Sequence, residues 1–188
     1  MRKLILAAFA LVLALVAWQP AAAQYRDTTR VNGLTAGDYG RNLMRRLNDT
    51  GPNAWAGATN ETEYHPSFVT MINENGRLAG RNYGGPDYEG DPVCQCQDGG
   101  AEYQVISANQ AGSRFFHLRF GRSSRFANGH VDRTEYTVVI TPYRGHWRVW
   151  DVVTREGSTR MLLTRHNACL RAAGGAQAID RCFARAPR

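Results

Sequence analysis

Hydrophobic positions recur with a helical period in the first half of the chain. The stretches 35–47 and 66–79 carry apolar residues every three or four positions, which is the spacing of one helix face. Pro66 suits the first turn of a helix, and Gly51 and Pro52 end the first stretch. The pattern therefore predicts two amphipathic helices with a polar, turn-rich segment between them.

The second half of the chain predicts strands instead. Aromatic and β-branched residues show two-residue periodicity in four segments, 102–108, 114–121, 134–142 and 146–154. The sequence PYRG between the last two is short enough to force an antiparallel hairpin. These segments predict a four-stranded antiparallel meander.

The last of these strands is apolar on both faces. Strict alternation divides its side chains into Trp147, Val149, Asp151 and Val153 on one face and Arg148, Trp150 and Val152 on the other. We expect one face to pack on the helices. The other face would line a pocket, or be covered by a partner or by the terminal segments.

Two further helices are predicted after the strands. Ser158 is expected to cap a helix that ends near Ala172, and 176–185 is expected to form a short return helix after the glycine pair 174–175. The residues expected to be buried on the longer helix are Met161, Leu162, Cys169 and Leu170.

This layout is α+β, with two N-terminal helices, a four-stranded antiparallel meander and a C-terminal helical hairpin. We assign 24–34 to an irregular lead-in, 35–172 to a single α+β domain and 173–188 to a C-terminal tail. The chain has 188 residues, enough for one domain with a hydrophobic core.

Residues 1–23 have the features of a signal peptide. A basic start precedes an apolar run over 4–17, and small residues up to Ala23 mark a cleavage site. The run is too short to span a bilayer comfortably, which argues against the alternative of an uncleaved anchor. We expect cleavage after Ala23, a periplasmic or secreted protein, and no membrane association after cleavage.

Cleavage would remove Arg2 and Lys3 and lower the formal charge from +7 to +5. A moderate positive charge is compatible with acidic partners or anionic envelope polymers, although solubility alone is the simpler explanation. Arginines and phenylalanines are interspersed over 114–126. In proteins that bind single-stranded nucleic acids, such residues stack on the bases. Export argues against a nucleic-acid partner, and a half-buried amphipathic strand explains the pattern.

The segment GDPVCQCQDGG at 90–100 holds two of the four cysteines. A zinc site needs four suitably spaced ligands, whereas the other candidates are scattered over several elements. A nucleophilic cysteine needs a base beside it, and the later His166 fits this role only superficially. The second thiol, two positions away, would also tend to block the first. An even number of cysteines in an oxidising compartment instead predicts two disulfides. We therefore predict no metal, no cofactor and no catalytic residue.

Two kinds of disulfide pairing are compatible with the spacing. Cys169 and Cys182 lie 13 positions apart across the glycine pair, and a bridge between them would stabilise the tail by about 3 kcal/mol. Cys94 and Cys96 would then form a small ring of their own. Crossed pairing would instead connect these two cysteines to the C-terminal helices.

Two motifs carry a resemblance to a known family. The turn DPVCQCQD at 91–98 and the strand GHWRVWDVV at 145–153 resemble a bacterial family of exported domains of unknown function, with a D-P-x-C-x-C-Q-D turn and a W-R-[IV]-x-D strand. These domains resemble the cone-shaped fold of nuclear transport factor two and the cystatin-like proteins. The residues that carry the motifs are Asp91, Pro92, Cys94, Cys96, Gln97, Asp98, Trp147, Arg148 and Asp151.

The resemblance has three implications. Some similar proteins are discussed as immunity proteins that block peptidoglycan-cleaving toxins in the periplasm. The family supplies no catalytic assignment for the motif residues. Its turn resembles a self-contained unit, which favours the local pairing of Cys94 with Cys96. For Asp91 and Asp98, capping of the turn is favoured over binding of a hard cation.

We favour a non-catalytic periplasmic binding or inhibitory domain, most concretely an immunity-type protein that binds an envelope hydrolase. One alternative is a small-molecule-binding or enzymatic cone-fold domain with Trp150 and Asp151 in its pocket, although a structural carboxylate is the simpler interpretation of Asp151. A pocket filled by Trp147 or Trp150 would argue against that alternative. A further alternative is a redox module at Cys94 and Cys96.

Overall fold

The computed structural model describes residues 29–50, 63–80, 92–94, 101–126 and 128–183. These residues form an α+β fold with a five-stranded antiparallel sheet and four α-helices, so the predicted fold class is confirmed. The predicted signal peptide and the motif residues Asp91, Cys96, Gln97 and Asp98 lie outside the described residues.

The elements match the predicted order. The helices are α2 (Ala36–Thr50), α4 (Pro66–Leu78), α5 (Thr159–Ala173) and α6 (Ile179–Phe183), with the 3₁₀ helix η3 (Gly175–Ala178) before α6. The strands are β1 (Ala101–Ala111), β2 (Phe115–Arg125), β3 (Val131–Tyr143), β4 (His146–Thr154) and β5 (Gly157–Ser158). The predicted number of four strands is wrong, because the two residues of β5 are too few to show a period.

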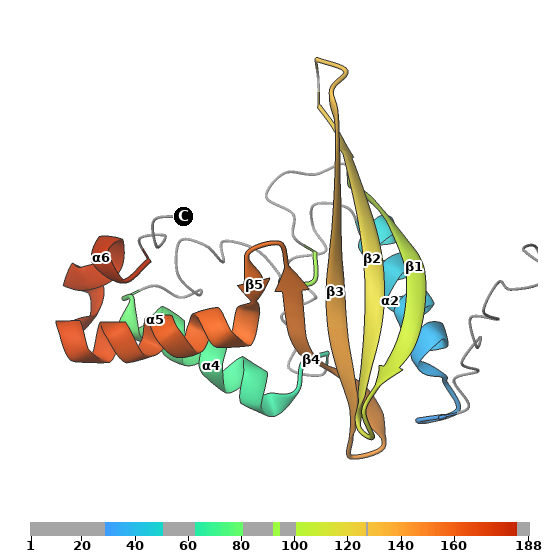
Figure 1. The fold of residues 1–188 in the computed structure, drawn as a ribbon, viewed down its shortest axis with the longest axis horizontal. Helices are drawn as coiled ribbons and strands as arrows, with labels where there is room; N and C mark the ends of the chain where they lie inside the picture. Colours follow the sequence, from blue (N-terminus) through green and yellow to red (C-terminus); the bar gives the residue numbers. More distant parts are fainter. Residues whose placement is uncertain (1–28, 51–62, 81–91, 95–100, 127, 184–188) are drawn as a thin grey trace, which may run out of the picture.

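The strands follow one another across the sheet in the order β1-β2-β3-β4-β5, each antiparallel to the next (Figure 1). In such a meander the β1–β2 and β3–β4 turns lie at one end of the sheet and the β2–β3 turn at the other. We call the first of these, with residues 112–114 and 144–145, the hairpin end.

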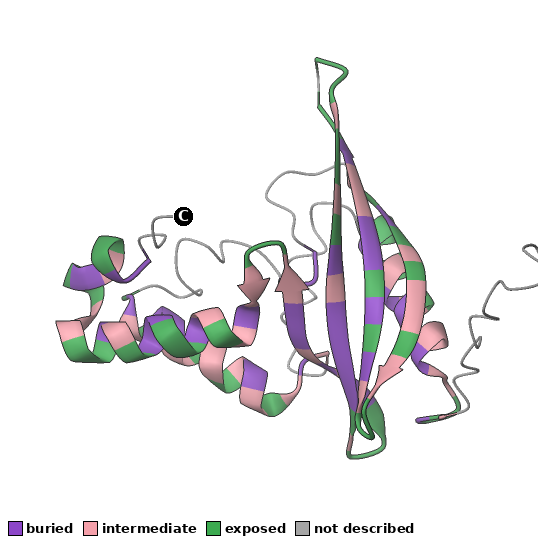
Figure 2. Ribbon diagram, in the orientation of Figure 1, coloured by how far each residue is buried: buried purple, intermediate pink, exposed green. Residues whose placement is uncertain are grey.

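Helix α2 packs across β1 and β2 on one face of the sheet (Figure 1). Phe116, Leu118 and Phe120 alternate along β2 and are almost completely buried on this face. A Cβ atom on Gly40 would lie 3.2 Å from Leu118 Cδ1, so the helix approaches the strand closely because this residue is glycine. The main core therefore lies between α2 and the middle strands, where the buried residues gather (Figure 2).

Helices α4 and α5 pack on each other beside the β4–β5 edge rather than over the centre of the sheet (Figure 1). The chain enters α4 from a short pairing with β4, in which His65 N donates to Val149 O at 2.8 Å and Val149 N donates to Glu63 O at 2.9 Å. This pairing fixes the start of α4 against the half of β4 nearest the hairpin end.

The buried face of α5 matches the predicted one only in part: Leu170 is buried as predicted, Leu162 and Cys169 are partly buried, and Met161 is not buried. Leu163, His166, Asn167 and Leu170 are buried, whereas Met161 is 73% exposed. Asn75 Nδ2 of α4 donates to Asn167 Oδ1 at 2.7 Å, so a polar pair lies in the contact between the helices. The prediction for Met161 is wrong because α4 covers the face on which Leu163 and Leu170 recur seven residues apart.

A disulfide between Cys169 and Cys182 joins α5 to α6. Both cysteines lie in a second apolar cluster with Ala79, Leu170 and Phe183. The predicted C-terminal helical hairpin and its bridge are therefore confirmed. Because these two cysteines bond to each other, both crossed pairings are excluded.

The strict alternation predicted for β4 is wrong. The register pairs Val139 with Asp151 and the next residue, Ile140, with Val149, so Trp150 is an extra residue in a β-bulge. After the bulge the alternation is shifted by one position. Val152 therefore joins Val149 among the fully buried residues.

No helix among the described residues has both the length and the apolar character needed to cross a bilayer.

Candidate functional site

The bulge in β4 places Asp151 next to the start of α5. The Asp151 carboxylate accepts hydrogen bonds from Ser158 Oγ at 2.5 Å, Val152 N at 2.8 Å and Arg160 N at 3.0 Å. Ser158 is the N-cap of α5, as predicted, and its Oγ accepts from Met161 N at 3.1 Å. Asp151 is 8% exposed, and its carboxylate accepts from the Ser158 hydroxyl and the Arg160 amide at the N-terminus of α5, where a negative charge is favoured.

Trp150 lies at the centre of a group of aromatic side chains. The ring centroid of His65 is 4.7 Å from that of Trp150 and 4.6 Å from that of Tyr143. Phe115 lies 5.4 Å from Trp150. The Arg160 guanidinium carbon lies 3.9 Å from the Trp150 ring centroid, a cation–π distance. We call His65, Phe115, Tyr143, Trp150 and Arg160 the aromatic platform.

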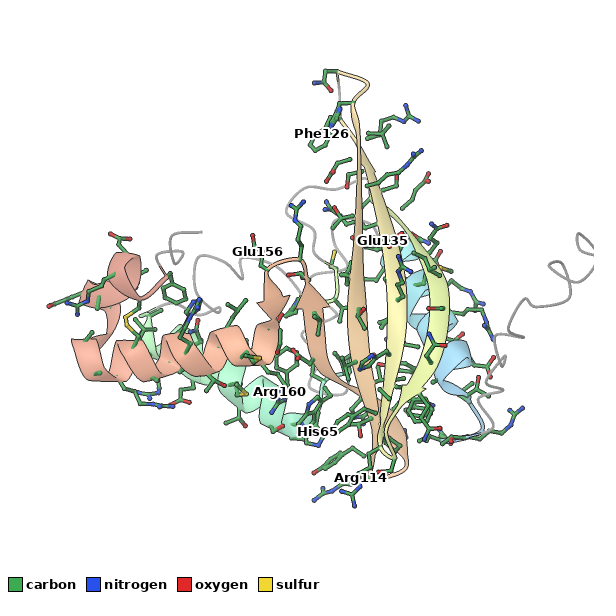
Figure 3. The ribbon with its side chains drawn as sticks, viewed as in Figure 1. His65, Arg114, Phe126, Glu135, Glu156 and Arg160 are labelled. Atoms are coloured by element: carbon green, nitrogen blue, oxygen red, sulfur yellow. A yellow bond between two sulfur atoms is a disulfide. The ribbon has the colours of Figure 1, made fainter. Side chains whose placement is uncertain are left out.

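Every member of the platform is partly exposed. They come from distant parts of the chain: the start of α4, the start of β2, the end of β3, the β4 bulge and the start of α5. In Figure 3, His65 and Arg160 lie toward the hairpin end, whereas Phe126 lies at the opposite end of the sheet. The platform is thus a surface assembled by tertiary structure from side chains that do not form one sequence motif.

Hydrogen bonds hold two of the platform side chains in place. Ser67 N donates to His65 Nδ1 at 3.3 Å, so the histidine caps the α4 N-terminus. Arg160 Nη2 donates to Ser67 Oγ at 3.1 Å, and Arg160 Nη1 donates to Trp150 O at 3.1 Å. Burial, together with the nearby Arg160 charge, holds the pKa of His65 below its ordinary value. The neutral ring therefore keeps Nδ1 free to accept the capping bond.

The pair Ser67–His65 has the contact distance of a nucleophile and a base, 2.8 Å between Oγ and Nδ1. Its surroundings do not complete that arrangement. The same Nδ1 accepts the capping N–H, and among the described residues no carboxylate contacts the imidazole ring. We therefore interpret the pair as the cap of α4.

Two arginines flank the platform at the tips of the hairpins. Arg114 lies in the β1–β2 turn, and its carbonyl oxygen accepts from Thr141 Oγ1 at 3.0 Å, which ties this turn to β3. Arg144 lies in the two-residue β3–β4 turn, with its guanidinium carbon 5.4 Å from the Tyr143 ring centroid. We call Arg114 and Arg144 the hairpin arginines. Both are exposed, and neither forms an ion pair with a described residue.

The other two motif residues of β4 have different surroundings. Trp147 is 3% exposed, packs 5.0 Å from Phe116 between ring centroids, and donates from Nε1 to Leu34 O at 2.9 Å. It therefore fills the core that the enzymatic alternative would use as a pocket. Arg148 is partly buried. Burial alone would raise the pKa of Glu63, but the hydrogen bond and charge of Arg46, with smaller contributions from Tyr39 and Arg148, hold that pKa below its ordinary value.

The described part of the cysteine turn, residues 92–94, is anchored in the core. Val93 and Cys94 are 2% and 1% exposed. Tyr136 Oη donates to Val93 O at 2.6 Å, and Tyr103 Oη donates to Cys94 O at 2.8 Å. Cys94 is disulfide-bonded. The predicted Cys94–Cys96 bridge involves a residue outside the described part of the chain.

A hollow of about 420 Å³ lies at the other end of the sheet. Its walls combine residues of both charges from β1, β2 and β3, and Gly121 lies among them. One of these acids, Glu135, pairs with Arg119. No group of metal-ligating side chains occurs among the described residues, which include the hollow and the platform.

Sequence reasoning identified Trp150 and Asp151 as neighbours in a candidate site but missed the other platform residues. The only indication in the sequence was the second apolar face of β4, which predicted that other side chains pack on it. The start of α4 and the start of α5 supply part of that cover through His65 and Arg160. His65 and Arg160 reach Trp150 because of the β4 bulge and the pairing of 63–65 with β4. Neither feature produces a periodic pattern in the sequence.

Comparison of the sequence with models of protein families gives no match, and comparison with curated proteins gives none either. The resemblance described from the two motifs therefore stays a prediction.

Proposed function

We propose that this chain is an exported, non-catalytic binding domain that docks on a protein partner through the aromatic platform and the hairpin arginines. The observation that carries the proposal is the platform itself, in which partly exposed Trp150 and Tyr143 lie beside arginines that make no ion pair with described residues. Trp, Tyr and Arg are the residues that most often dominate binding energy in protein interfaces.

The packing of the platform also supports a binding role. Its rings contact one another edge to face or at a tilt, and Arg160 covers one side of Trp150. Side chains held by their neighbours lose little conformational freedom when a partner binds, which reduces the entropic cost of association. A preformed aromatic surface is therefore suited to recognition of another protein.

The most concrete form of the proposal is an immunity-type inhibitor of an envelope hydrolase. This form depends on the resemblance of the DPVCQCQD turn and the WRVWD strand, together with the predicted signal peptide. The enzymatic alternative has less support, because Trp147 is a core residue and the Asp151 carboxylate satisfies three donors, one on β4 and two at the start of α5. The redox alternative has no supporting observation in the described residues.

Affinity purification from envelope extracts tests the proposal. The wild-type chain and the variants Tyr143→Ala and Phe126→Ala would serve as bait, with partners identified by mass spectrometry. Phe126 is the matched control, since it is an exposed aromatic residue at the opposite end of the sheet. We expect one partner with wild type and Phe126→Ala that is lost with Tyr143→Ala.

The purified partner would then be assayed for hydrolysis of cell-wall material with and without the domain. Inhibition would support the immunity-type form. Recovery of the same partner by all three baits, or of none by the wild type, would overturn the proposal that the platform is the binding surface.

A further inference from the structure

We infer that the partner presents an acidic segment to the hairpin end, where carboxylates bind between Arg114 and Arg144 while the segment packs on the aromatic platform. This inference rests on the proposed function, because it specifies the chemistry of the partner at the same surface. Four observations carry it.

The first observation is the placement of the two charges. Arg114 and Arg144 belong to separate hairpins whose turns lie at the same end of the sheet. Their chain segments are connected, because Thr141 Oγ1 bonds to the Arg114 carbonyl and Arg114 immediately precedes Phe115 of the platform. The two arginines therefore lie at the tips of the two hairpins, each next in sequence to an aromatic residue of the platform, Phe115 or Tyr143.

The second observation is the lack of local neutralisation. The acids closest in sequence to platform residues are already engaged, Asp151 by donors at the start of α5 and Glu63 by Arg46 and Tyr39. Asp38, at the start of α2, pairs with Arg41. Glu135 and Glu156 lie away from the hairpin end (Figure 3). Among the described residues, no carboxylate is paired with either hairpin arginine. This end of the molecule is thus a positive surface that a carboxylate-bearing partner complements.

The third observation is the backbone at Arg144. Arg144 has φ of +48° and Gly145 has φ of +77°, the two positive angles of a type I′ hairpin turn. Asn, Asp or Gly is the usual first residue of this turn, because other side chains are strained in that conformation. An arginine at this position is less favourable for the backbone than asparagine or glycine, and the proposed binding of a carboxylate by its side chain gives a reason for its presence.

The fourth observation favours a protein partner over a lipid bilayer. The large apolar side chains that are exposed in the described residues are Ile106, Phe126 and Met161, and none of them belongs to the platform. The platform rings are instead partly buried against one another. Insertion into a bilayer would need exposed apolar side chains at this end. Binding of an acidic protein segment needs only a preformed aromatic surface with guanidinium groups beside it.

A peptide selection tests the inference. A displayed library of random 12-residue peptides would be selected at low salt against the complete mature chain and two double variants. One variant is Arg114→Gln with Arg144→Gln. The control is Arg125→Gln with Arg133→Gln, which removes the same charge from exposed positions toward the opposite end.

We expect the wild type and the control to enrich peptides with two or more acidic residues. The affinity of a synthetic enriched peptide, measured by tryptophan fluorescence, should fall roughly tenfold in the Arg114/Arg144 variant. It should fall by less than about twofold in the control, and it should weaken as salt is added. Vesicles with an anionic phospholipid would be assayed in parallel.

Selected peptides without acidic enrichment, or equal affinity in both double variants, would overturn the inference. Binding to vesicles but not to any peptide would overturn it in favour of a lipid surface. The inference and the proposed function can fail separately. If an envelope partner depends on Tyr143 but is insensitive to salt and to the loss of both hairpin arginines, the inference is overturned while the platform remains the binding surface. If no envelope partner depends on Tyr143, the proposed function itself is overturned.

Discussion

Asp151 accepts hydrogen bonds from three groups, and each of them belongs to β4 or to the start of α5. At the scale of single residues, such contacts decide between functional interpretations that a sequence leaves open. The Ser158 cap was predictable from residue type alone. The surroundings of Asp151 were not, because the β4 bulge changes the face on which this residue lies.

The structural role of Asp151 gives a first prediction. Asp151→Asn replaces one acceptor oxygen by a donor group, so the variant should lose about 1–3 kcal/mol in its free energy of unfolding. Urea denaturation followed by circular dichroism measures this loss. Ser158→Ala, which removes the cap but leaves the carboxylate, should lose about 1 kcal/mol. An Asp151→Asn variant as stable as wild type would show that these bonds do not stabilise the start of α5.

The strained turn residue gives a second prediction. Arg144→Asn should raise the free energy of unfolding by about 0.5–1 kcal/mol, because asparagine tolerates positive φ better than arginine does. Arg114→Asn is the control, because Arg114 is not among the residues with positive φ. Thermal and urea denaturation would be compared for both. A loss of stability in Arg144→Asn, with none in the control, would mean that the arginine side chain stabilises the turn more than its backbone strains it.

At the scale of elements, the periodicity of apolar residues predicted where helices and strands lie. It did not predict segments whose conformation is set by hydrogen bonds to another element. Strand β4 begins and ends as predicted, and α4 begins at the expected proline. The pairing of Glu63–His65 with Val149 and the two-residue strand β5 were missed. Both depend on backbone hydrogen bonds across the fold, which leave no pattern in the side chains.

The cap of α4 gives a prediction for pH dependence. The pKa of His65 in the folded protein lies below its ordinary value of 6.5, so the unfolded chain takes up this proton first as the pH falls. The contribution of His65 to stability is therefore complete above about pH 7 and declines as the pH falls from about 6.5 toward the lower folded pKa. Urea denaturation at several pH values measures the decline.

The control for this effect is a comparison of two histidine variants. His65→Gln should lose part of the decline below pH 6.5, whereas His117→Gln, at an exposed position on β2, should keep it. Equal pH dependence in the wild type and both variants would contradict the assignment of His65 as a neutral cap.

The bridge between α5 and α6 gives a further prediction. Replacing Cys169 and Cys182 by serine should lower the free energy of unfolding by about 3 kcal/mol, because the bridge closes a loop across the glycine pair. Limited proteolysis should cut first near 174–175 in this variant. If the variant resisted both urea and protease as well as the wild type does, apolar packing around Phe183 would be sufficient to hold α6.

At the scale of the whole molecule, the meander brings two turns to one end, and the start of α4 and the start of α5 meet them there. The sequence was sufficient to predict the fold class and the C-terminal hairpin, because local periods and short connections determine them. It was not sufficient to predict the aromatic platform. That surface joins His65 to Trp150 and Arg160 across long separations in the chain, and such contacts become visible only when the elements are placed in space.

The central claim is that the aromatic platform contacts a protein partner in the cell envelope. Site-specific photo-crosslinking in cells tests it most directly, with benzoylphenylalanine introduced in place of Tyr143 or, as the control, of Phe126 at the opposite end of the sheet. We predict a discrete cross-linked species from position 143, absent from position 126 and reduced by Arg114→Gln. Cross-links at equal yield from both positions, or from neither, would contradict the claim.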